Sequence, residues 1–244
     1  MLWLLGYPRQ ALQRSQDALT LAQEQSHPFT LSLTLATVAV LQQWRRERQA
    51  ALAHVKASLA LATEHGFPYL QAVGIVLQGW ALTRGGQVGE GMVQMRQGLD
   101  ELRAMGAEVL RPYLLALLAE VCGRSGQIKA GLDMLEEALV TAENHTERFN
   151  EADLHRLKGE LLLRQCEGAR CKAEACFQRA LDIARHQQAK SLELRAATSL
   201  ARLWQQQGKR DDARQLLAEV YGWFTEGFDA ADLQEAKALL DALC

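Results

Sequence analysis

A short sequence pattern recurs along this chain at a nearly constant interval, and this periodicity constrains the fold more than any other feature. In five of the six copies a glycine precedes a small residue by five positions, as in the stretch from Gly126 to Gly131. The copy from Arg46 to Ala51 has lost the glycine. The small residue recurs every forty positions, with one interval of forty-two, at Ala11, Ala51, Gly91, Gly131, Ala173 and Ala213. Repeats of this length are typical of solenoids, so we expect one repeat domain over residues 1–244.

Two further rows of small residues predict two helices in each repeat. One row lies twelve positions before the first row and contains Ala39, Gly79, Ala119 and Ala201. Gly159 joins it if two extra residues lie in the turn around Cys166 to Lys172, which also explains the interval of forty-two. The other row is followed by leucine in five copies, as Ala18-Leu19, Ser58-Leu59, Gly98-Leu99, Ala138-Leu139 and Ala180-Leu181. Small residues on one helix face let a neighbouring helix approach closely.

The fold class expected from this pattern is all-α, a right-handed superhelical solenoid of antiparallel helix pairs in about six repeats. Abundant Ala, Leu, Gln, Glu and Arg favour helices over strands, and all four prolines fall where helices are expected to begin. Helix 229–243, beginning at Asp229, is expected to form a C-terminal cap. The predicted helices are 8–25, 29–44, 48–65, 69–84, 88–105, 109–124, 128–144, 149–165, 170–187, 190–206, 210–222 and 229–243.

The first residues look like the end of a helix whose earlier turns are missing. Leu2 to Leu5 are apolar, and Gly6 follows where other copies have their turn glycine. We therefore expect the chain to be part of a longer protein, truncated at its N-terminus. Apolar surface left at this edge would favour self-association.

Charge and composition argue against several partners. The net charge is −2, with 27 basic and 29 acidic residues, which predicts no direct binding of nucleic acid. The longest apolar run, Leu31 to Leu41, is too short for a membrane span. Five cysteines without framework-like spacing, and the absence of a basic leader, predict a cytoplasmic protein. The basic cluster Arg45, Arg46 and Arg48 is read as a solvated turn, with a phosphate contact as the alternative.

The helix-pair pattern resembles the tetratricopeptide repeat (TPR), here with a period of about 40 residues instead of the usual ~34. Two stretches narrow the resemblance: Leu154 to Leu163 (LHRLKGELLL), and Tyr221 to Asp229 (YGWFTEGFD) with the helix after it. They are similar to the C-terminal ends of bacterial class III adenylate/guanylate cyclase–ATPase fusions that carry a helical array. The longer repeat itself looks like the arrays of bacterial signalling proteins of the maltose-activator type. The resemblance implies a regulatory or scaffolding segment. The P-loop of those proteins is missing from this sequence.

No group of residues has the spacing of a catalytic or metal site. Cys166, Cys171 and Cys176 are spaced by five, whereas zinc ligands are usually paired two to four residues apart. The histidines are scattered, and His27, His65, His145 and His186 are expected near the ends of second helices, where an imidazolium would favour the helix dipole. We expect no enzyme activity, no cofactor and no metal.

The first helices provide the candidate site, because they form the concave wall in the repeat family that the chain resembles. Transferring that wall through the register yields an apolar front half and a charged rear half. The candidate partner-binding residues are Trp80, Tyr113, Glu120, Arg156, Glu160, Arg195 and Arg202. Aromatic and arginine side chains dominate interface energies. Two alternatives stay open: the aromatic rings fill the core, or the arginines pair internally with Glu120, Asp153 and Glu160.

Two functions remain under consideration. The first is a non-enzymatic module that binds a protein segment, or upstream ATPase or cyclase domains of the same polypeptide, on its concave face. The second is a small-molecule sensor that controls such an attached ATPase or cyclase. A deep cleft with several convergent polar groups would favour the sensor, and a broad shallow groove would favour the interaction module.

Overall fold

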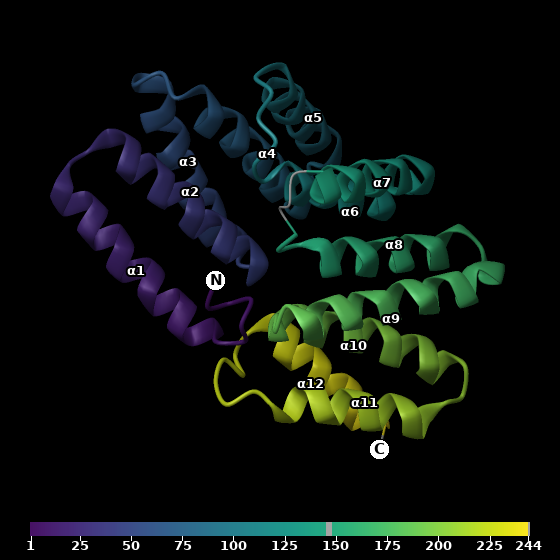
Figure 1. Cartoon of the computed structure of the whole chain (residues 1–244). Helices are drawn as coiled ribbons and strands as arrows, with labels where there is room; N and C mark the ends of the chain where they lie inside the picture. Colours follow the sequence, from purple (N-terminus) through teal and green to yellow (C-terminus); the bar gives the residue numbers. More distant parts are fainter. Residues whose placement is uncertain (145–147, 244) are drawn as a thin grey trace. The chain divides into compact units, whose positions relative to one another are not determined.

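The computed structural model describes residues 1–144 and 148–243, and every regular element in those ranges is helical (Figure 1). The all-α fold class built from helix pairs is therefore confirmed. The elements are α1 (Pro8–Gln25), α2 (Pro28–Trp44), α3 (Arg48–Glu64), α4 (Pro68–Arg84), α5 (Val88–Ala104), α6 (Arg111–Arg124), α7 (Ile128–Asn144), α8 (Glu151–Gln165), the short 3-10 helix η1 (Glu167–Ala169), α9 (Arg170–His186), α10 (Lys190–Gln206), α11 (Arg210–Gly222) and α12 (Ala231–Leu243). Within the described residues, no helix combines the length and hydropathy that crossing a bilayer requires.

Three predicted helix starts are two residues early. Helix α6 begins at Arg111 instead of 109 because Leu110 has a left-handed φ of 62°, which a right-handed helix excludes. Helix α8 begins at Glu151 instead of 149. Helix α12 begins at Ala231 instead of 229. A turn occupies the preceding residues, with the Ala230 N–H donating to the Gly227 carbonyl at 2.8 Å.

The contacts divide the chain into two compact units. Unit 1 comprises Met1–Ala11 and Ile128–Cys244, and unit 2 comprises Leu12–Gln127. In unit 2, α2 packs on α3 and α4 on α5, and α4 also contacts α2 and α6. In unit 1, α8 packs on α9 and α10 on α11, and α10 also contacts α8 and α12. The single domain over residues 1–244 stays a prediction.

The rows of small residues lie where helices approach most closely. A Cβ added to Gly79 would lie 2.5 Å from the carbonyl oxygen of Gly91, and one added to Gly98 would lie 2.6 Å from the carbonyl oxygen of Ala72. Helices α4 and α5 therefore touch backbone to backbone. One member departs from the expected pattern: Ala18 is exposed, and only its neighbour Leu19 is buried.

Most turns between helices share one geometry, in which a residue with left-handed φ is followed by a backbone bond spanning five positions. Such a Schellman bond satisfies a carbonyl at the helix end. In the turns where the sequence shows a glycine, Gln87 N–H donates to Leu82 O and Lys209 N–H to Trp204 O. The same bond occurs at Glu47, although Arg46 stands in the glycine position with φ 63°. The turn geometry is thus kept where the glycine is lost.

The basic cluster of Arg45, Arg46 and Arg48 was predicted to be solvated, but one of its arginines is buried. Arg45 is buried, and its Nε lies 2.7 Å from the Glu47 carboxylate. Arg48 Nε donates to the Ala81 carbonyl oxygen at 2.8 Å. The arginine stems cover neighbouring helices while the guanidinium groups bind within unit 2. The solvated-turn prediction is therefore wrong for Arg45.

Gln188 offers a test of the turn geometry. It is exposed and has φ 54°, which is unfavourable for a residue with a Cβ. Gln188→Gly is expected to raise the free energy of unfolding by about 0.5–1 kcal/mol, the part of the strain that the extra chain entropy of glycine does not offset. The reciprocal change Gly208→Gln, at φ 81° with open space around it, should lower it by about 1 kcal/mol. Urea unfolding of both variants measures this, and shifts of the same sign would contradict it.

Candidate functional site

The two predicted aromatic anchors lie in the core of unit 2. Trp80 on α4 is 1% exposed, and Tyr113 on α6 is 3% exposed. The Tyr113 hydroxyl donates to Gln43 Oε1 at 2.6 Å, and its ring meets Trp44 edge-on. Burial of both rings supports the alternative in which they fill the space between helices. Glu120 is only half-buried and pairs with Arg84 at 3.3 Å.

The predicted charged residues of unit 1 lie on the neighbouring helices α8 and α10, and α12 adds two further carboxylates. Helices α8, α10 and α12 contact one another in sequence, with α10 in the middle. Side chains three, four or seven positions apart share a helix face, so each helix contributes a short charged row. We call this set the charged face. It comprises Asp153, Arg156 and Glu160 on α8, Arg195, Ser199 and Arg202 on α10, and Asp232 and Glu235 on α12.

Arg156 is held by carboxylates of its own helix. Its Nε lies 2.6 Å from Asp153 Oδ1, and its Nη1 lies 2.6 Å from Glu160 Oε1. Glu160 also accepts a hydrogen bond from the Ser199 hydroxyl at 2.9 Å. Charge-assisted bonds of this length are strong. They fix the position of Arg156 and join α8 to α10.

Arg195 joins α10 to α12. Its Nε lies 2.8 Å from Asp232 Oδ2, and its Nη1 lies 4.0 Å from Asp153 Oδ2. The side chain is only 11% exposed. The ring of Trp3 lies 4.7 Å from its guanidinium carbon, within cation–π range. The internal ion-pair ladder that the sequence left open is therefore present at Arg156 and Arg195.

Arg202 lies two turns farther along α10, where the charged face meets solvent. It is 42% exposed, and its Nη2 lies 2.5 Å from Glu235 Oε1. Glu160 and Glu235 are half-buried. The charged face thus has a buried, internally paired part around Arg195 and an accessible part around Arg202.

The α12 residues of the charged face were missed from the sequence. Asp232 and Glu235 lie in a helix that was expected only to cap the array. The register that relates Tyr113, Asp153 and Arg195 continues one period later to Glu235. Reading 231–243 as the first helix of another repeat, instead of as a cap, would have placed Glu235 on this face.

His155 lies beside the charged face on α8, and its pKa is lowered to about 4. Burial is the main cause, and the positive charges of Arg179 and Lys158 add to it, while Glu136 opposes them. Among the other histidines, His27 lies two residues past the end of α1, near a helix end as predicted. It caps the start of α2, where its Nδ1 accepts from the Thr30 N–H at 3.3 Å. His145 lies outside the described residues.

The His155 environment predicts a pH dependence of stability. Because its folded pKa lies below the unfolded value of about 6.5, the unfolded chain binds the proton first. Stability is therefore full above pH 6.5 and falls as the pH drops toward 4. After allowing for solvent screening at a half-buried group, we expect about 1–2 kcal/mol. Thermal unfolding of wild type and His155→Leu at pH 7.5 and 4.5 measures this. An unchanged pH dependence in the variant would contradict it.

The three evenly spaced cysteines, Cys166, Cys171 and Cys176, do not form a metal-binding group. Cys166 and Cys171 are exposed, and Cys176 is half-buried, where burial raises the pKa of its thiol. Over residues 1–144 and 148–243, no three His, Cys, Asp or Glu side chains are grouped as metal ligands would be. Cys244 lies outside those ranges.

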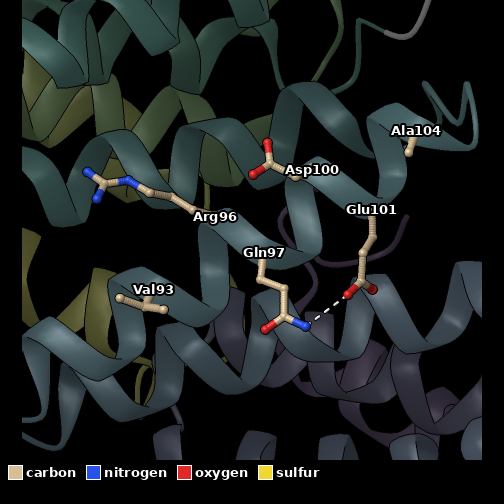
Figure 2. Close-up of a pocket in the computed structure, with 6 residues that line it drawn as sticks. All are labelled: Val93, Arg96, Gln97, Asp100, Glu101 and Ala104. Atoms are coloured by element: carbon tan, nitrogen blue, oxygen red, sulfur yellow. Dashed lines mark hydrogen bonds between the residues drawn. The ribbon is translucent and has the colours of Figure 1, made fainter.

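A depression of about 570 Å³ runs along α5 in unit 2 (Figure 2). Its described lining comes from this one helix and carries charges of both signs. The Gln97 side-chain N–H donates to Glu101 Oε1 at 2.9 Å, and Figure 2 draws this bond as a dashed line. Val93 in the lining is largely exposed. The lining residues are Val93, Arg96, Gln97, Asp100, Glu101 and Ala104. This is an open surface depression and not a deep cleft with convergent polar groups.

Known structures with this fold are TPR-like repeat proteins. The chain superimposes on NprR in complex with its cognate peptide NprX with a TM-score of 0.65 at 16% identity, covering 99% of this chain and 70% of that one. BtubC from P. vanneervenii gives a TM-score of 0.61 at 16% identity, over 97% and 89% of the two chains. The TPR-like repeats of a Podosopora anserina kinesin light chain give 0.55 at 18% identity, over 81% and 95%. The TPR-like fold expected from the repeat pattern is thereby confirmed.

Sequence comparisons add one relative. The chain is 28% identical over 204 residues to an uncharacterized protein of Rhizobium meliloti (strain 1021), and the match covers 83% of this chain. It spans only 20% of the length of that relative. No family model matches the chain.

Proposed function

We propose that this chain is a non-enzymatic, cytoplasmic protein-interaction module of a bacterial signalling protein, and that the charged face binds a protein segment. That segment belongs to a partner or to upstream ATPase or cyclase domains of the same polypeptide. The TPR-like fold supports the proposal, as does the peptide complex of NprR. The resemblance to cyclase–ATPase fusions and maltose-activator-type regulators supports the signalling context. The match to one fifth of a longer relative fits a module within a larger protein.

The observation that carries the proposal is the accessible pair Arg202–Glu235 beside the internally paired Arg156 and Arg195. Arg156 and Arg195 are held by carboxylates on both sides, so the wall behind the accessible pair is preorganised. Arg202 can exchange Glu235 for a carboxylate of a ligand, because its planar fork binds two oxygens at once. Glu235 and Glu160 can then receive a basic group. The charged face thus fits a peptide with an acidic and a basic side chain.

The sensor alternative has less support. It needs an enclosed cleft, whereas the depression on α5 is open and lined by one helix. The parent class can be tested separately, since the complete reading frame of the gene should encode a cyclase or P-loop ATPase domain upstream of residue 1. A frame without either would remove the signalling context and leave the interaction module.

A peptide library displayed on phage tests the binding function. Peptides selected on the full chain should lose at least tenfold in affinity for the variant Arg202→Ala with Glu235→Ala, and their salt dependence should flatten. The control variant Arg14→Ala with Asp17→Ala removes an exposed pair of unit 2 and should bind normally. Selected peptides that bind both variants equally, or no enrichment of any peptide, would overturn the assignment of the charged face.

A further inference from the structure

The first eleven residues of the chain pack on unit 1, beside the start of α10 and the connection between α11 and α12 (Figure 1). Residues 1–7 form a hydrogen-bonded turn, in which the Leu5 N–H donates to Met1 O at 3.2 Å and the Tyr7 N–H donates to Leu2 O at 3.0 Å. Trp3 is 2% exposed, and Leu4 is also buried. This short segment therefore buries its apolar side chains against elements almost two hundred positions away in the sequence.

The end of this turn meets the beginning of α10. The Ser191 hydroxyl donates to the Trp3 carbonyl at 2.5 Å, and the Ser191 N–H donates to the Leu4 carbonyl at 3.1 Å. The last carbonyls of a helical turn and the first N–H groups of a helix both lack partners within their own helix. Here the Leu4 carbonyl and the Ser191 N–H satisfy each other, while the Trp3 carbonyl, which also accepts from the Gly6 N–H at 3.0 Å, receives the Ser191 hydroxyl in addition.

Aromatic contacts position the same segment. The Trp3 ring lies against the Arg195 guanidinium at 4.7 Å, and Tyr7 meets Trp223 edge-on with 5.5 Å between ring centroids. Gly6, at φ 90°, lets the backbone pass close to α10, because a Cβ there would lie 2.8 Å from the Lys190 Cβ. The segment thus fits a surface shaped for a tryptophan followed closely by a tight turn.

Glu226 holds the far end of the segment. Its Oε1 accepts from the N–H groups of Arg9 at 3.1 Å and Gln10 at 3.0 Å, and its Oε2 accepts from the Gln10 side chain at 3.2 Å. These are N–H groups of the first turn of α1, which are normally capped by a neighbour in sequence. A carboxylate from the α11–α12 connection replaces that local cap.

We propose that Ser191, Arg195, Trp223 and Glu226 form a recognition site for the C-terminal turn of a helix carrying a tryptophan, and that residues 1–11 occupy it as an intramolecular ligand. The inference rests on the proposed function, because Arg195 belongs to the charged face. The inference identifies residues 1–11 as the segment that binds at the Arg195 end of the charged face. While Trp3 lies on Arg195, that surface is closed to a competing segment. On this proposal residues 1–11 leave the site while α10 stays folded.

A labelled synthetic peptide of residues 1–13, titrated into the full chain by fluorescence anisotropy, tests the site. The wild-type chain carries its own copy at high effective concentration, so it should bind the peptide weakly. The full chain with Trp3→Ala should bind it at least tenfold more tightly. Adding Ser191→Ala should weaken that binding at least threefold. Ser125→Ala, a control in unit 2 and outside the charged face, should leave it unchanged. Equal binding to wild type and Trp3→Ala would overturn the proposal.

Hydrogen exchange of the wild-type chain tests whether residues 1–11 open separately from the rest of unit 1. This test holds even if circular dichroism shows that Trp3→Ala does not fold. The amides of Tyr7, Arg9 and Gln10 should exchange at least tenfold faster than those at the centre of α10, and Glu226→Ala should accelerate them further without changing α10. Exchange of both regions at one rate would show that residues 1–11 open only with unit 1, and the proposal would fail. The phage-selected peptides report on Arg202 and Glu235 independently, so the proposed function can survive this failure.

Discussion

Gly79→Ala is expected to lower the free energy of unfolding of unit 2 by about 2 kcal/mol, although alanine is the better helix former. The added methyl would lie 2.5 Å from the Gly91 carbonyl oxygen and 2.7 Å from Met95 Cγ. A backbone oxygen cannot move aside like the end of a side chain, so α4 and α5 must separate. Overpacking of this kind costs about 1–3 kcal/mol, more than the gain of about 0.5–1 kcal/mol in helix propensity.

The matched control is the same substitution ten positions later. Gly89 lies in the first turn of α5 with no atom within contact distance of an added Cβ, so Gly89→Ala should stabilise the protein by about 0.5 kcal/mol. Urea denaturation followed by circular dichroism measures both changes. If the two variants shift the midpoint in the same direction, the close approach of α4 and α5 is contradicted.

Arg195→Ala and Arg202→Ala, two turns apart on α10, should differ sharply in their effect on stability. Removing Arg195 leaves Asp232 and Asp153 without their shared cation at a site that is 11% exposed, and it removes the cation under Trp3. Breaking a buried pair costs about 3–5 kcal/mol, and partial exposure reduces this to about 2–3 kcal/mol. Arg202 is 42% exposed, so its removal should cost about 0–1 kcal/mol.

When peptide binding is measured instead of stability, Arg202→Ala should have the larger effect of the two variants. Arg202→Ala should lower the affinity for the selected peptides while leaving the melting temperature nearly unchanged, because the pair of Arg202 with Glu235 is accessible. Thermal unfolding and anisotropy measurements on the two single variants separate the roles. Equal losses of stability would contradict the distinction between the buried and the accessible part of the charged face.

Most helix boundaries could be predicted from the sequence because they depend on nearby residues. Proline at a helix start and glycine at a helix end act within one turn, and the repeat supplies several copies of each signal. The prediction was less accurate where a turn is made without its usual residue. Leu110 takes a left-handed φ that glycine would ordinarily supply, so the start of α6 was placed two residues early.

The candidate site could be predicted only in part. Arg156, Glu160, Arg195 and Arg202 do lie together in unit 1, because the register places them on neighbouring first helices. Their ion-pair partners on α12, Asp232 and Glu235, could not be predicted in the same way. The register does not show how far each helix is rotated about its axis, and this rotation buries Trp80 and Tyr113 while leaving Arg202 accessible.

The sequence by itself determined that this chain forms helix pairs, where most of the helices begin and end, and where small residues let them touch, because these properties repeat and depend on short-range interactions. Only the tertiary structure decided which charges are paired across α8, α10 and α12. It also decided that residues 1–11 belong to unit 1. Ser191 and Trp3 are 188 positions apart, and each contact of this kind depends on the packing of several helices at once, which no local pattern records.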